Sequence, residues 1–369
     1  MPKDNESKKK ILYIMGIDWL WIYQRPQILA EKLSQHYDVT VIFPRSIINI
    51  RYKAIKLSSE FVKKKVLWTI PYQEKIKAVG AAAKLFQQLL FRNYQQYDYI
   101  MVGYPLYAKY IPDDYKGQII YDCMDNHKAL YPDRKRVSRI ILQEERLIKK
   151  SSIVFASSLL LCKKVNRIAQ EAKAILIRNG VETGQICEIK KAEIKPVYKI
   201  GYIGTIDTWF DFKLLKDSLK LNSVFTYHLI GPFNRLKKKS HSRLIYEGVI
   251  EHKYLSGYIR DYDCLLMPFL LNDVVLSVDP LKLYEYISFG KCIISIFYPE
   301  IKRFEEFVYF YSTVEEYMEL LGQLCKKGFP AKYNKEQQVG FLEDNTWDNR
   351  YNKLHQVIND KEAERVHAV

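Results

Sequence analysis

The chain has 369 residues, a hydrophobic fraction of 48% and a formal net charge of +16 at pH 7. This length suggests two domains of ordinary size, each large enough to bury a core. No window of 18 residues is apolar and free of charge, so no membrane-spanning helix is expected, and the polar N-terminus lacks the apolar core of a signal peptide. The charge suits nucleic acid, an anionic membrane surface or anionic substrates, and composition alone does not choose among them.

The six cysteines are scattered along the chain, with no CxxC pair and no histidine at the spacing of a metal site. This pattern is typical of reduced thiols in a cytoplasm and argues against a zinc site. We therefore expect a cytoplasmic protein without a bound metal.

The first half of the chain alternates between strand-like and helix-like segments. Residues 8–16 are expected to form a strand that ends in a glycine, residues 26–36 a helix, and residues 38–44 a second strand. This β-loop-α-β order opens a doubly wound α/β sheet. Further strands are predicted over residues 97–103, 117–126, 151–158 and 174–182, the last running into an Asn-Gly turn, and a helix is predicted over residues 137–150.

Residues 51–97 interrupt this alternation. Residues 51–56 and 61–68 are basic with interleaved apolar side chains, and residues 78–91 have the pattern of a helix with one apolar face. The simplest interpretation is a solvated basic insert over a helix that packs on the sheet. The alternative is a surface that contacts a membrane or a lipid-linked acceptor.

The second half repeats the α/β pattern. Residues 183–196 are polar and end in a proline, so they are expected to be a linker. A new strand is predicted over residues 198–205, and more strands over residues 225–232, 244–250, 264–269 and 292–297. Residues 345–360 are predicted to form a terminal amphipathic helix.

The helix predicted over residues 279–290 carries the most chemistry. Asp279 is expected to cap its free amides, Pro280 to occupy its first position and Gly290 to end it in a left-handed conformation. Lys282 and Glu285 are three residues apart and share one face. A cation beside a helix N-terminus suits a diphosphate, and a carboxylate one turn further can accept hydrogen bonds from a ribose diol. The alternative is a capped surface helix with an ion pair.

Several strings stand in order between residues 11 and 350. They are QRPQ at 24–27 after Trp19, YDCMD at 121–125, RNGVE at 178–182, GYIG at 201–204 with WFD at 209–211, EGV at 247–249 with YDCLLMP at 262–268, DPLKLYEYISFGK at 279–291 and NTWDNR at 345–350. Each string is weak alone. In series they resemble the motifs of GT-B glycosyltransferases, in particular the family-4-like group that includes teichuronic-acid and other cell-surface polysaccharide transferases.

The resemblance implies an α/β protein of GT-B fold, with two Rossmann-like doubly wound domains facing across a cleft. Residues 1–195 would bind the acceptor and residues 196–345 the nucleotide-sugar. Residues 346–369 would form a C-terminal helix that packs back toward the N-terminal domain.

The resemblance also implies a donor site. Glu285 would hold the ribose hydroxyls and also count among the catalytic residues, and Lys282 would hold the diphosphate. The other donor-site residues would be Gly16, Gly204, Thr205, Gly231, Pro232 and Val249, of which the last three border the base. The family carries an acid eight residues before this glutamate, where this chain has Ser277, so the sugar contact and the stereochemical outcome stay open.

The acceptor side is expected to lie in the first half of the chain. Asp125 is a candidate base or acceptor ligand, and its alternative role is to cap a strand-end turn. Arg25 would reach a phosphate of the donor or of a lipid-linked acceptor, and the alternative is an arginine on the protein surface. The same motifs add Trp19, Asp122 and Asn126 to the acceptor side, whereas His127, His228 and His241 show no pairing pattern and are interpreted as structural.

The expected function is a hexosyltransferase-type glycosyltransferase that moves a sugar from a nucleotide-sugar to a growing cell-surface glycan of polysaccharide, teichuronic-acid or lipopolysaccharide type. Neither a metal nor another cofactor is expected, because basic side chains and helix dipoles would handle the diphosphate charge. The expected partners are the donor, a glycan or lipid-linked acceptor and an anionic membrane at the inner face of the cell, but no nucleic acid. The alternatives are a nucleotide-sugar epimerase of the same fold and a non-enzymatic basic protein that binds membrane or nucleic acid.

Overall fold

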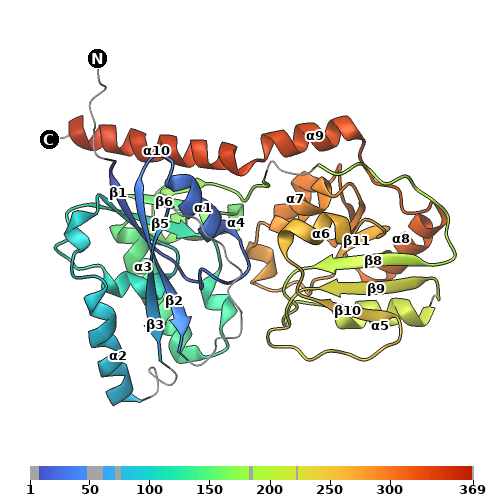
Figure 1. Cartoon of the computed structure of the whole chain (residues 1–369), viewed down its shortest axis with the longest axis horizontal. Coiled ribbons are helices and arrows are strands. Elements are labelled where there is room, and N and C mark those ends of the chain that lie inside the picture. Colours follow the sequence, from blue (N-terminus) through green and yellow to red (C-terminus); the bar gives the residue numbers. More distant parts are fainter. Residues whose placement is uncertain (1–7, 48–60, 71–75, 183–185, 222, 368–369) are drawn as a thin grey trace. The chain divides into compact units, whose positions relative to one another are not determined.

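The computed structural model describes residues 8–47, 61–70, 76–182, 186–221 and 223–367. The chain divides into two compact units, which we call unit 1 (Met1–Arg178 with Arg350–Val369) and unit 2 (Asn179–Asn349). Each unit is built around one parallel sheet with its own helices (Figure 1). The chain passes between the units after Arg178 and after Asn349, whereas the sequence placed the boundaries after residues 195 and 345.

The sheet of unit 1 has seven strands in the order β3-β2-β1-β4-β5-β6-β7, and all of its pairs are parallel. Strands such as β4 are buried along their whole length, as expected for a parallel sheet that is covered on both faces. The strands are β1 (Lys10–Ile14), β2 (Asp38–Ser46), β3 (Lys63–Thr69), β4 (Tyr99–Val102), β5 (Gln118–Cys123), β6 (Ile153–Ala156) and β7 (Ala174–Leu176). The helices are α1 (Arg25–Leu33), α2 (Lys77–Leu89), η1 (Tyr94–Gln96), η2 (Pro105–Tyr110), η3 (His127–Leu130), α3 (Arg134–Lys150) and α4 (Leu159–Ala169).

Strand β3 corrects the prediction of a solvated basic insert. It pairs in parallel with β2, from Thr40 opposite Lys63 to Ser46 opposite Thr69, and forms the edge of the sheet. Lysines fill residues 63–65 and hide the strand pattern, yet lysines are what exposed edge strands use against pairing with other chains. The predicted helix of this region is present as α2. Residues 51–60 and 71–75 of the predicted insert lie outside the described residues.

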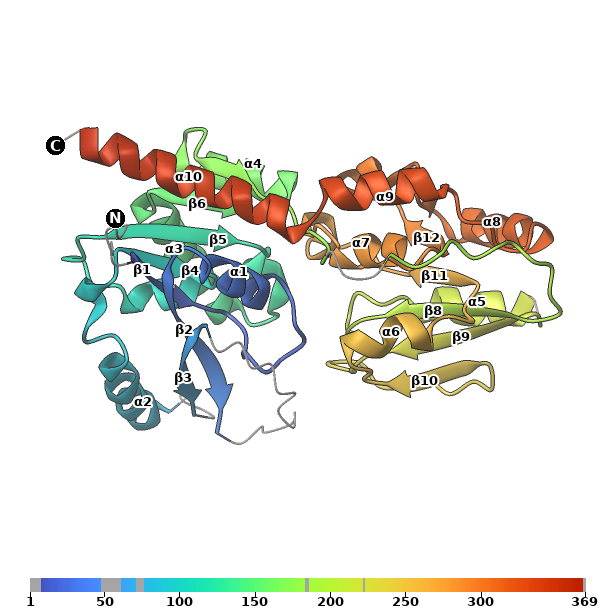
Figure 2. The same cartoon turned by 45° about the horizontal axis from the view of Figure 1, so that its top comes forward.

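The sheet of unit 2 has six strands in the order β10-β9-β8-β11-β12-β13, again all parallel. Its strands are β8 (Tyr198–Ile203), β9 (Phe225–Ile230), β10 (Leu244–Gly248), β11 (Cys264–Met267), β12 (Cys292–Ile296) and β13 (Tyr309–Tyr311). Its helices are α5 (Phe212–Leu221), α6 (His252–Tyr258), η4 (Val275–Ser277), α7 (Leu281–Ser288), η5 (Pro299–Phe304), α8 (Val314–Lys326) and α9 (Lys335–Asp344). Figure 2 shows these helices on both sides of the sheet.

Two of the motifs that carried the resemblance pair with each other inside unit 2. The backbone N–H of Val181 donates to the carbonyl of Asn345 at 2.9 Å, and the N–H of Trp347 donates to the carbonyl of Val181 at 3.0 Å. A Cβ on Gly180 would lie 2.9 Å from the backbone of Thr346, which explains the glycine. The predicted Asn-Gly turn is wrong, because Gly180 is not among the glycines with positive φ and the segment runs on into this β-bridge.

The segment predicted as a linker, residues 183–196, packs on unit 2 where it is described. The N–H of Cys187 donates to the carbonyl of Ser288, and the N–H of Lys190 donates to the carbonyl of Gly290. The ammonium of Lys190 also pairs with Asp263 at 2.9 Å. This segment is therefore part of the body of unit 2.

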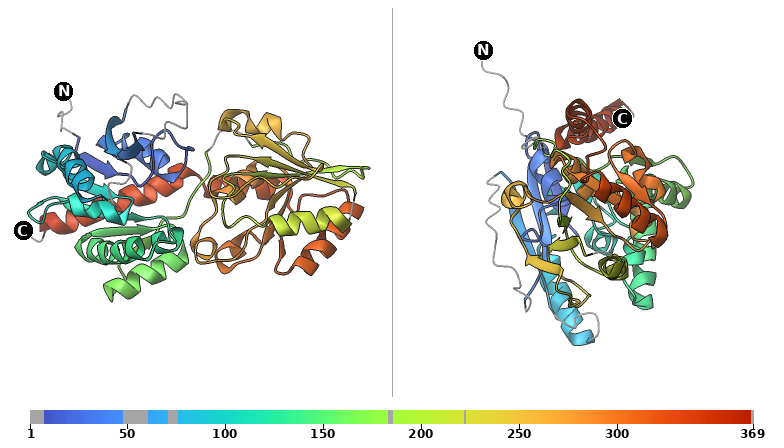
Figure 3. Two further views of the ribbon diagram at one scale, coloured as in Figure 1. Left: turned by 90° about the horizontal axis from the view of Figure 1, so that it is seen from below. Right: turned by 90° about the vertical axis from the view of Figure 1, so that its right-hand side faces the viewer.

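The last helix, α10 (Trp347–His367), begins in unit 2 and runs along unit 1 (Figure 3). Glu362 accepts a hydrogen bond from Tyr99 at 2.9 Å and one from Gln118 at 2.7 Å. Tyr351 bonds His36 at 2.6 Å. Among the described helices, none has the length and apolar character needed to cross a membrane.

Candidate functional site

The carboxyl edge of the unit 2 sheet has a floor of bare backbone. Gly204 follows β8, Gly231 follows β9 and Gly248 ends β10, with φ values of +140°, +136° and +78°. The N–H of Gly231 donates to the carbonyl of Gly248 at 2.7 Å, and a Cβ on Gly231 would lie 2.1 Å from the carbonyl oxygen of Gly204. Only glycine fits this conformation and this contact, so a ligand can approach the backbone closely.

Lys282 extends from the first turn of α7 over this floor. A Cβ on Gly204 would lie 2.2 Å from the Cε of Lys282, and the Lys282 ammonium lies 5.8 Å from the ring centroids of both Tyr202 and Phe269. Within the described part of the chain, Lys282 forms no ion pair and no hydrogen bond. Burial lowers the pKa of its ammonium, which Glu285 partly opposes. A cation at a helix start that no described carboxylate pairs within hydrogen-bond distance suits a bound anion.

Glu285 lies one turn further along α7, and one of its carboxylate oxygens forms a hydrogen bond with His252, a residue that the sequence analysis did not predict for this site. Its Oε1 bonds the Nε2 of His252 at 3.2 Å. His252 opens α6, four residues after Gly248, and its hydrogen bond to Glu285 raises the pKa of the imidazole, with a smaller contribution from Glu182. The carboxylate keeps further lone pairs for a diol. The sequence did contain a hint of this contact, because His252 closely follows Gly248 and Val249 of the EGV motif.

Three other predicted donor residues lie at the same edge. The carbonyl of Thr205 accepts from Tyr202 at 2.7 Å, and the carbonyl of Pro232 accepts from the N–H of Ile206 at 2.9 Å. Val249 follows Gly248 and is 55% exposed. The structure therefore gathers all of the predicted donor residues except Gly16 around one edge of unit 2.

The start of α7 differs from the prediction. Pro280 occupies the N-cap position and Asp279 caps no amide of this helix. The buried Asp279 carboxylate instead accepts from the N–H of Asn179 at 2.7 Å and from Tyr284 at 3.1 Å, and it pairs with Arg303. The predicted end is confirmed, because Gly290 has a φ of +65° just after the helix.

Ser277 occupies the position where the sequence resemblance implied an acid, and it has a local structural role. Its Oγ donates to the carbonyls of Val274 at 2.8 Å and Asp273 at 3.0 Å, and its side chain is fully buried. These bonds close the short helix η4. Ser277 therefore does not replace the missing acid.

In unit 1, two of the predicted acceptor residues, Arg25 and Asp122, form an ion pair with each other. The guanidinium of Arg25 donates to both oxygens of Asp122, at 2.7 to 3.2 Å, and Tyr13 donates to the same carboxylate at 3.1 Å. Arg25 also donates to the carbonyl of Ile177 at 2.8 Å. Arg25 is 4% exposed and Asp122 is fully buried. The predicted phosphate contact of Arg25 is therefore not supported, because the ion pair leaves the guanidinium no open face.

Trp19 and Asn126 are also largely enclosed. Trp19 is 1% exposed, and the ammonium of Lys64 lies 5.1 Å above its ring. Asn126 is 6% exposed at the start of η3. Neither side chain presents the open surface that was expected of an acceptor contact.

Asp125 keeps its position as a candidate acid or base. It follows β5, is half-buried and forms no hydrogen bond or ion pair within the described residues. Burial, and then the Asp122 carboxylate, raise its pKa to about 6. The neighbouring His127 is buried, and burial lowers its pKa to about 3, so this imidazole is neutral. A carboxylate that titrates near neutral pH suits proton transfer.

Gly16 lies in unit 1, on the wall of a cavity of about 440 Å³. A Cβ on Gly16 would lie 2.8 Å from the Cβ of Tyr104. We call this cavity the tyrosine pocket, because its side chains include Tyr104, Tyr107, Tyr110 and Tyr131, together with Lys109 and Arg136. Gly16 belongs to unit 1 and the donor edge to unit 2, so the role of Gly16 in donor binding stays a prediction. The sequence missed this pocket, since its residues come from separate segments and form no motif.

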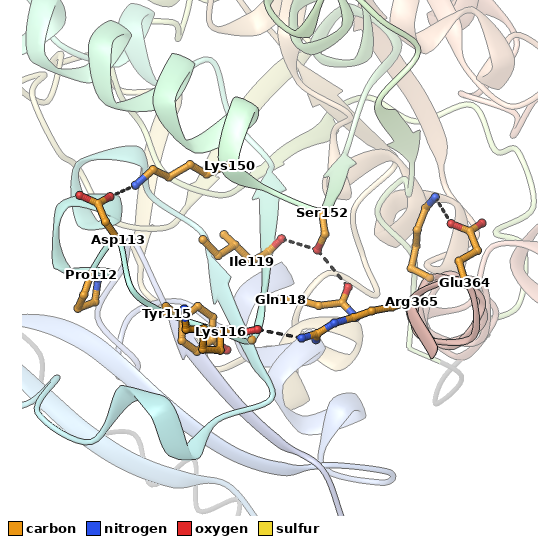
Figure 4. A pocket seen from close by; sticks show the side chains of 12 residues that line it. Pro112, Asp113, Tyr115, Lys116, Gln118, Ile119, Lys150, Ser152, Glu364 and Arg365 are labelled. Carbon is orange, nitrogen blue, oxygen red and sulfur yellow. Dashed lines mark hydrogen bonds and ion pairs between the residues drawn. The ribbon is translucent and has the colours of Figure 1, made fainter. Parts of the chain in front are cut away.

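A larger hollow, of about 700 Å³, lies beside the start of β5, at the amino ends of the unit 1 strands and thus opposite their carboxyl ends (Figure 4). Most of its charged side chains already interact within the protein: Lys150 pairs with Asp113, Lys361 pairs with Glu364, and Arg365 donates to the carbonyl of Lys116. Ligands of open α/β sheets bind at the carboxyl ends of the strands. This hollow is therefore not a candidate active site.

Comparison with known proteins places this geometry in context. No family model matches the chain. The chain is 26% identical over 239 residues to TuaH of Bacillus subtilis (strain 168), whose name describes it as a teichuronic acid biosynthesis glycosyltransferase. The matched region is 59% of this chain and spans 59% of that relative's length.

Solved structures match nearly the whole chain. Anabaena HepE in complex with UDP and glucose gives a TM-score of 0.70 at 13% identity, covering 95% of this chain and 99% of that one. TarM gives 0.69 at 10% identity, covering 97% and 100%, and the lipopolysaccharide outer core galactosyltransferase WaaB gives 0.63 at 14%, covering 95% and 99%. The chain therefore has the GT-B fold that the sequence predicted, and its resemblance to teichuronic-acid and surface-polysaccharide glycosyltransferases is confirmed.

Proposed function

We propose that the protein is a glycosyltransferase that moves a sugar from a nucleotide-sugar to a growing cell-surface glycan. The observation that carries this proposal is the Lys282 ammonium at the start of α7, which lies over the Gly204 backbone and forms no ion pair or hydrogen bond with the residues that the structure describes. Glu285 lies one turn further on the same helix. The names of TuaH and WaaB describe sugar transferases, and the HepE structure contains UDP and glucose, which supports the same class of reaction.

In this proposal the leaving diphosphate lies on the glycine floor. Lys282 and the amides at the start of α7 stabilise the charge that develops as the glycosidic bond to the diphosphate breaks. The rings of Tyr202 and Phe269 keep water away from the ammonium and strengthen its field. Glu285 holds the ribose, and Pro232 and Val249 border the base. The reaction needs no metal, because the lysine and the helix supply the positive charge.

Asp125 is the proposed acid or base on the acceptor side. Its pKa of about 6 leaves it largely ionised at pH 7, ready to accept the proton of an attacking hydroxyl. Because Asp125 belongs to unit 1 and Lys282 to unit 2, the proposal divides the work between the two units, with the acceptor on the first and the donor on the second.

The test is binding and turnover of nucleotide-sugars. Thermal shift and calorimetry with UDP-, GDP- and dTDP-sugars should identify one donor class, and Lys282→Met should weaken it, whereas the exposed Lys326→Met in α8 serves as the control. Hydrolysis of that donor gives the activity readout. If no nucleotide-sugar binds and the protein instead shows salt-sensitive binding to polyanions, it is a basic scaffold and the proposal fails.

The proposal includes peripheral binding to an anionic membrane from the cytoplasmic side. Helix α2 exposes Leu85 (69%), Phe86 (56%) and Leu89 (48%) on one face, and the neighbouring edge strand begins with three exposed lysines at residues 63–65. An apolar helix face beside basic residues suits a membrane of anionic lipids. We expect sedimentation with vesicles that contain anionic lipid but not with neutral vesicles. Phe86→Ser should reduce it, and equal binding to both kinds of vesicle would contradict the charge argument.

A further inference from the structure

We propose that the tyrosine pocket of unit 1 binds an anionic sugar, one that carries a carboxylate or a phosphate, at the acceptor end of the glycan. Naming this ligand as the acceptor rests on the proposed function. That the pocket takes an anionic sugar rests on its own geometry.

The pocket lies where the strand order of unit 1 reverses direction. Strands β1 and β4 are neighbours, and the chain builds β2 and β3 on one side of them and β5 to β7 on the other. Gly16 follows β1, Tyr104 follows β4, and both line the pocket. Open α/β sheets bind their ligands at this reversal, outside the carboxyl ends of the strands. The pocket therefore occupies the part of unit 1 best placed for a ligand.

The walls suit a sugar ring. The rings of Tyr104 and Tyr107 meet edge to face with centroids 5.2 Å apart, and those of Tyr107 and Tyr110 are 6.0 Å apart. The hydroxyl of Tyr110 donates to Gln87 at 2.6 Å, which fixes this wall to α2. Aromatic faces with a few fixed polar groups are typical of sites for small molecules. Helix α2 is also the element that exposes the apolar face proposed for the membrane.

The charge of the walls selects an anion. Lys109 and Arg136 line the pocket, and none of the described residues that line it is acidic. The guanidinium of Arg136 lies 3.9 Å above the ring of Tyr131 and donates to the hydroxyl of Tyr104 at 3.2 Å. These contacts hold the planar fork in place, and a fixed guanidinium matches the two oxygens of a carboxylate or a phosphate. A neutral sugar gains nothing from this charge.

The experiment measures binding of three small probes to the full chain by ligand-observed NMR and calorimetry. Methyl glucuronide tests the carboxylate, glucose 1-phosphate tests the phosphate, and methyl glucoside is the neutral counterpart. We expect one or both anionic probes to bind, which identifies the source of the charge, and the neutral probe to bind at least about tenfold more weakly.

Variants assign this binding to the pocket. Arg136→Gln should weaken the anionic probe about tenfold, Arg136→Lys should weaken it less, and Arg134→Gln, an exposed residue of the same helix, should have no effect. Thermal unfolding checks that each variant folds, and the lysine variant keeps the test decisive if the glutamine variant does not. Binding that is equal for the neutral probe, undetectable for all probes, or unchanged in folded Arg136 variants would overturn the proposal.

A separate titration distinguishes this proposal from the proposed function. Nucleoside diphosphate affinity should depend on Lys282 and not on Arg136, and affinity for the anionic sugar should show the reverse. If the sugar binds and no nucleotide does, the proposed function fails while the anion pocket stands. If the nucleotide binds and the anionic sugar does not, only the pocket assignment fails.

Discussion

The carboxyl edges of the two sheets share a parallel framework but differ in what forms their walls. In unit 2 the strands end in Gly204, Gly231 and Gly248, and the charge comes from one lysine on a helix. In unit 1 the edge carries tyrosines and an arginine around a cavity. A site made of backbone suits an invariant part such as a diphosphate, whereas a site made of side chains can be varied to suit different sugars. Under the proposed function, this difference assigns the leaving diphosphate to the edge of unit 2, and the acceptor together with the base Asp125 to the edge of unit 1.

Replacing Asp125 tests the division of work most directly. Asp125→Asn should lower kcat by about 10²- to 10⁴-fold while leaving nucleotide affinity unchanged, because it removes a base on the acceptor side only. The wild-type rate should fall as pH drops through about 6, where Asp125 becomes protonated, and this limb should be absent in the variant. Steady-state rates between pH 5 and 8 provide the measurement.

Although Asp125→Asn should lower activity, it should not lower the stability of the folded protein at neutral pH. Because the pKa of Asp125 is raised, the folded protein holds its proton more tightly than the unfolded chain, and ionisation costs stability as pH rises through the range from 3.8 to about 6. The asparagine variant should therefore be at least as stable as wild type at pH 7. A variant that is both inactive and unstable would indicate a structural role instead.

The buried pair of Arg25 and Asp122 sets the next largest effect. Asp122→Ala should lower the free energy of unfolding by about 3–5 kcal/mol, because it leaves the Arg25 charge buried without a partner. The double variant Arg25→Met with Asp122→Leu should recover most of this loss. Chemical unfolding of the full chain measures both. A stable Asp122→Ala protein that has lost acceptor binding would return Asp122 to the substrate site.

The fold was largely predictable from the sequence, with exceptions in each unit. Alternating apolar runs predicted both parallel sheets, but three lysines hid β3, whose edge position needs them. Asp279 looked like a helix cap, yet its carboxylate is taken by Asn179 and Tyr284, which are distant or buried partners that no local pattern reveals.

The candidate sites show the same limit. The donor edge was predictable because glycines with positive φ and a lysine at a helix start recur as short motifs. The tyrosine pocket was not, since Gly16, Tyr104 and Arg136 come together only through the strand order. Trp19 and Arg25 appeared as acceptor residues because sequence does not report burial.

Lys282 is the sharpest test of the donor edge. Lys282→Met keeps the length of the side chain and removes its charge, and it should weaken nucleoside diphosphate binding by about 10- to 100-fold. Because burial lowers the pKa of Lys282, the wild-type affinity should begin to fall at a lower pH than an exposed lysine would allow. Calorimetry over a pH series, with Lys326→Met as control, gives both values. If Lys282→Met left the affinity unchanged, the unit 2 edge would not be the site of the diphosphate, and the proposed difference between the two edges would be wrong.

The smallest expected effect concerns His252, which bonds Glu285 at 3.2 Å. Because this bond raises the pKa of His252, the charged pair is complete at acidic pH and is lost as pH rises through a value above 6.5. The groups that face the imidazole are Glu285 and Glu182, with Glu251 and Lys253 beside it on the chain. If the imidazolium orients Glu285 for the ribose, His252→Gln should keep the hydrogen bond but lose the pH dependence. The diphosphate titrates equally in both proteins, so dividing the wild-type affinity by the His252→Gln affinity removes its contribution to the pH dependence. This ratio should fall about two- to fivefold toward pH 8.5. A 2′-deoxyribose nucleotide, which lacks half of the diol, should show a smaller change, and a flat ratio would mean that Glu285 holds the ribose without help from His252.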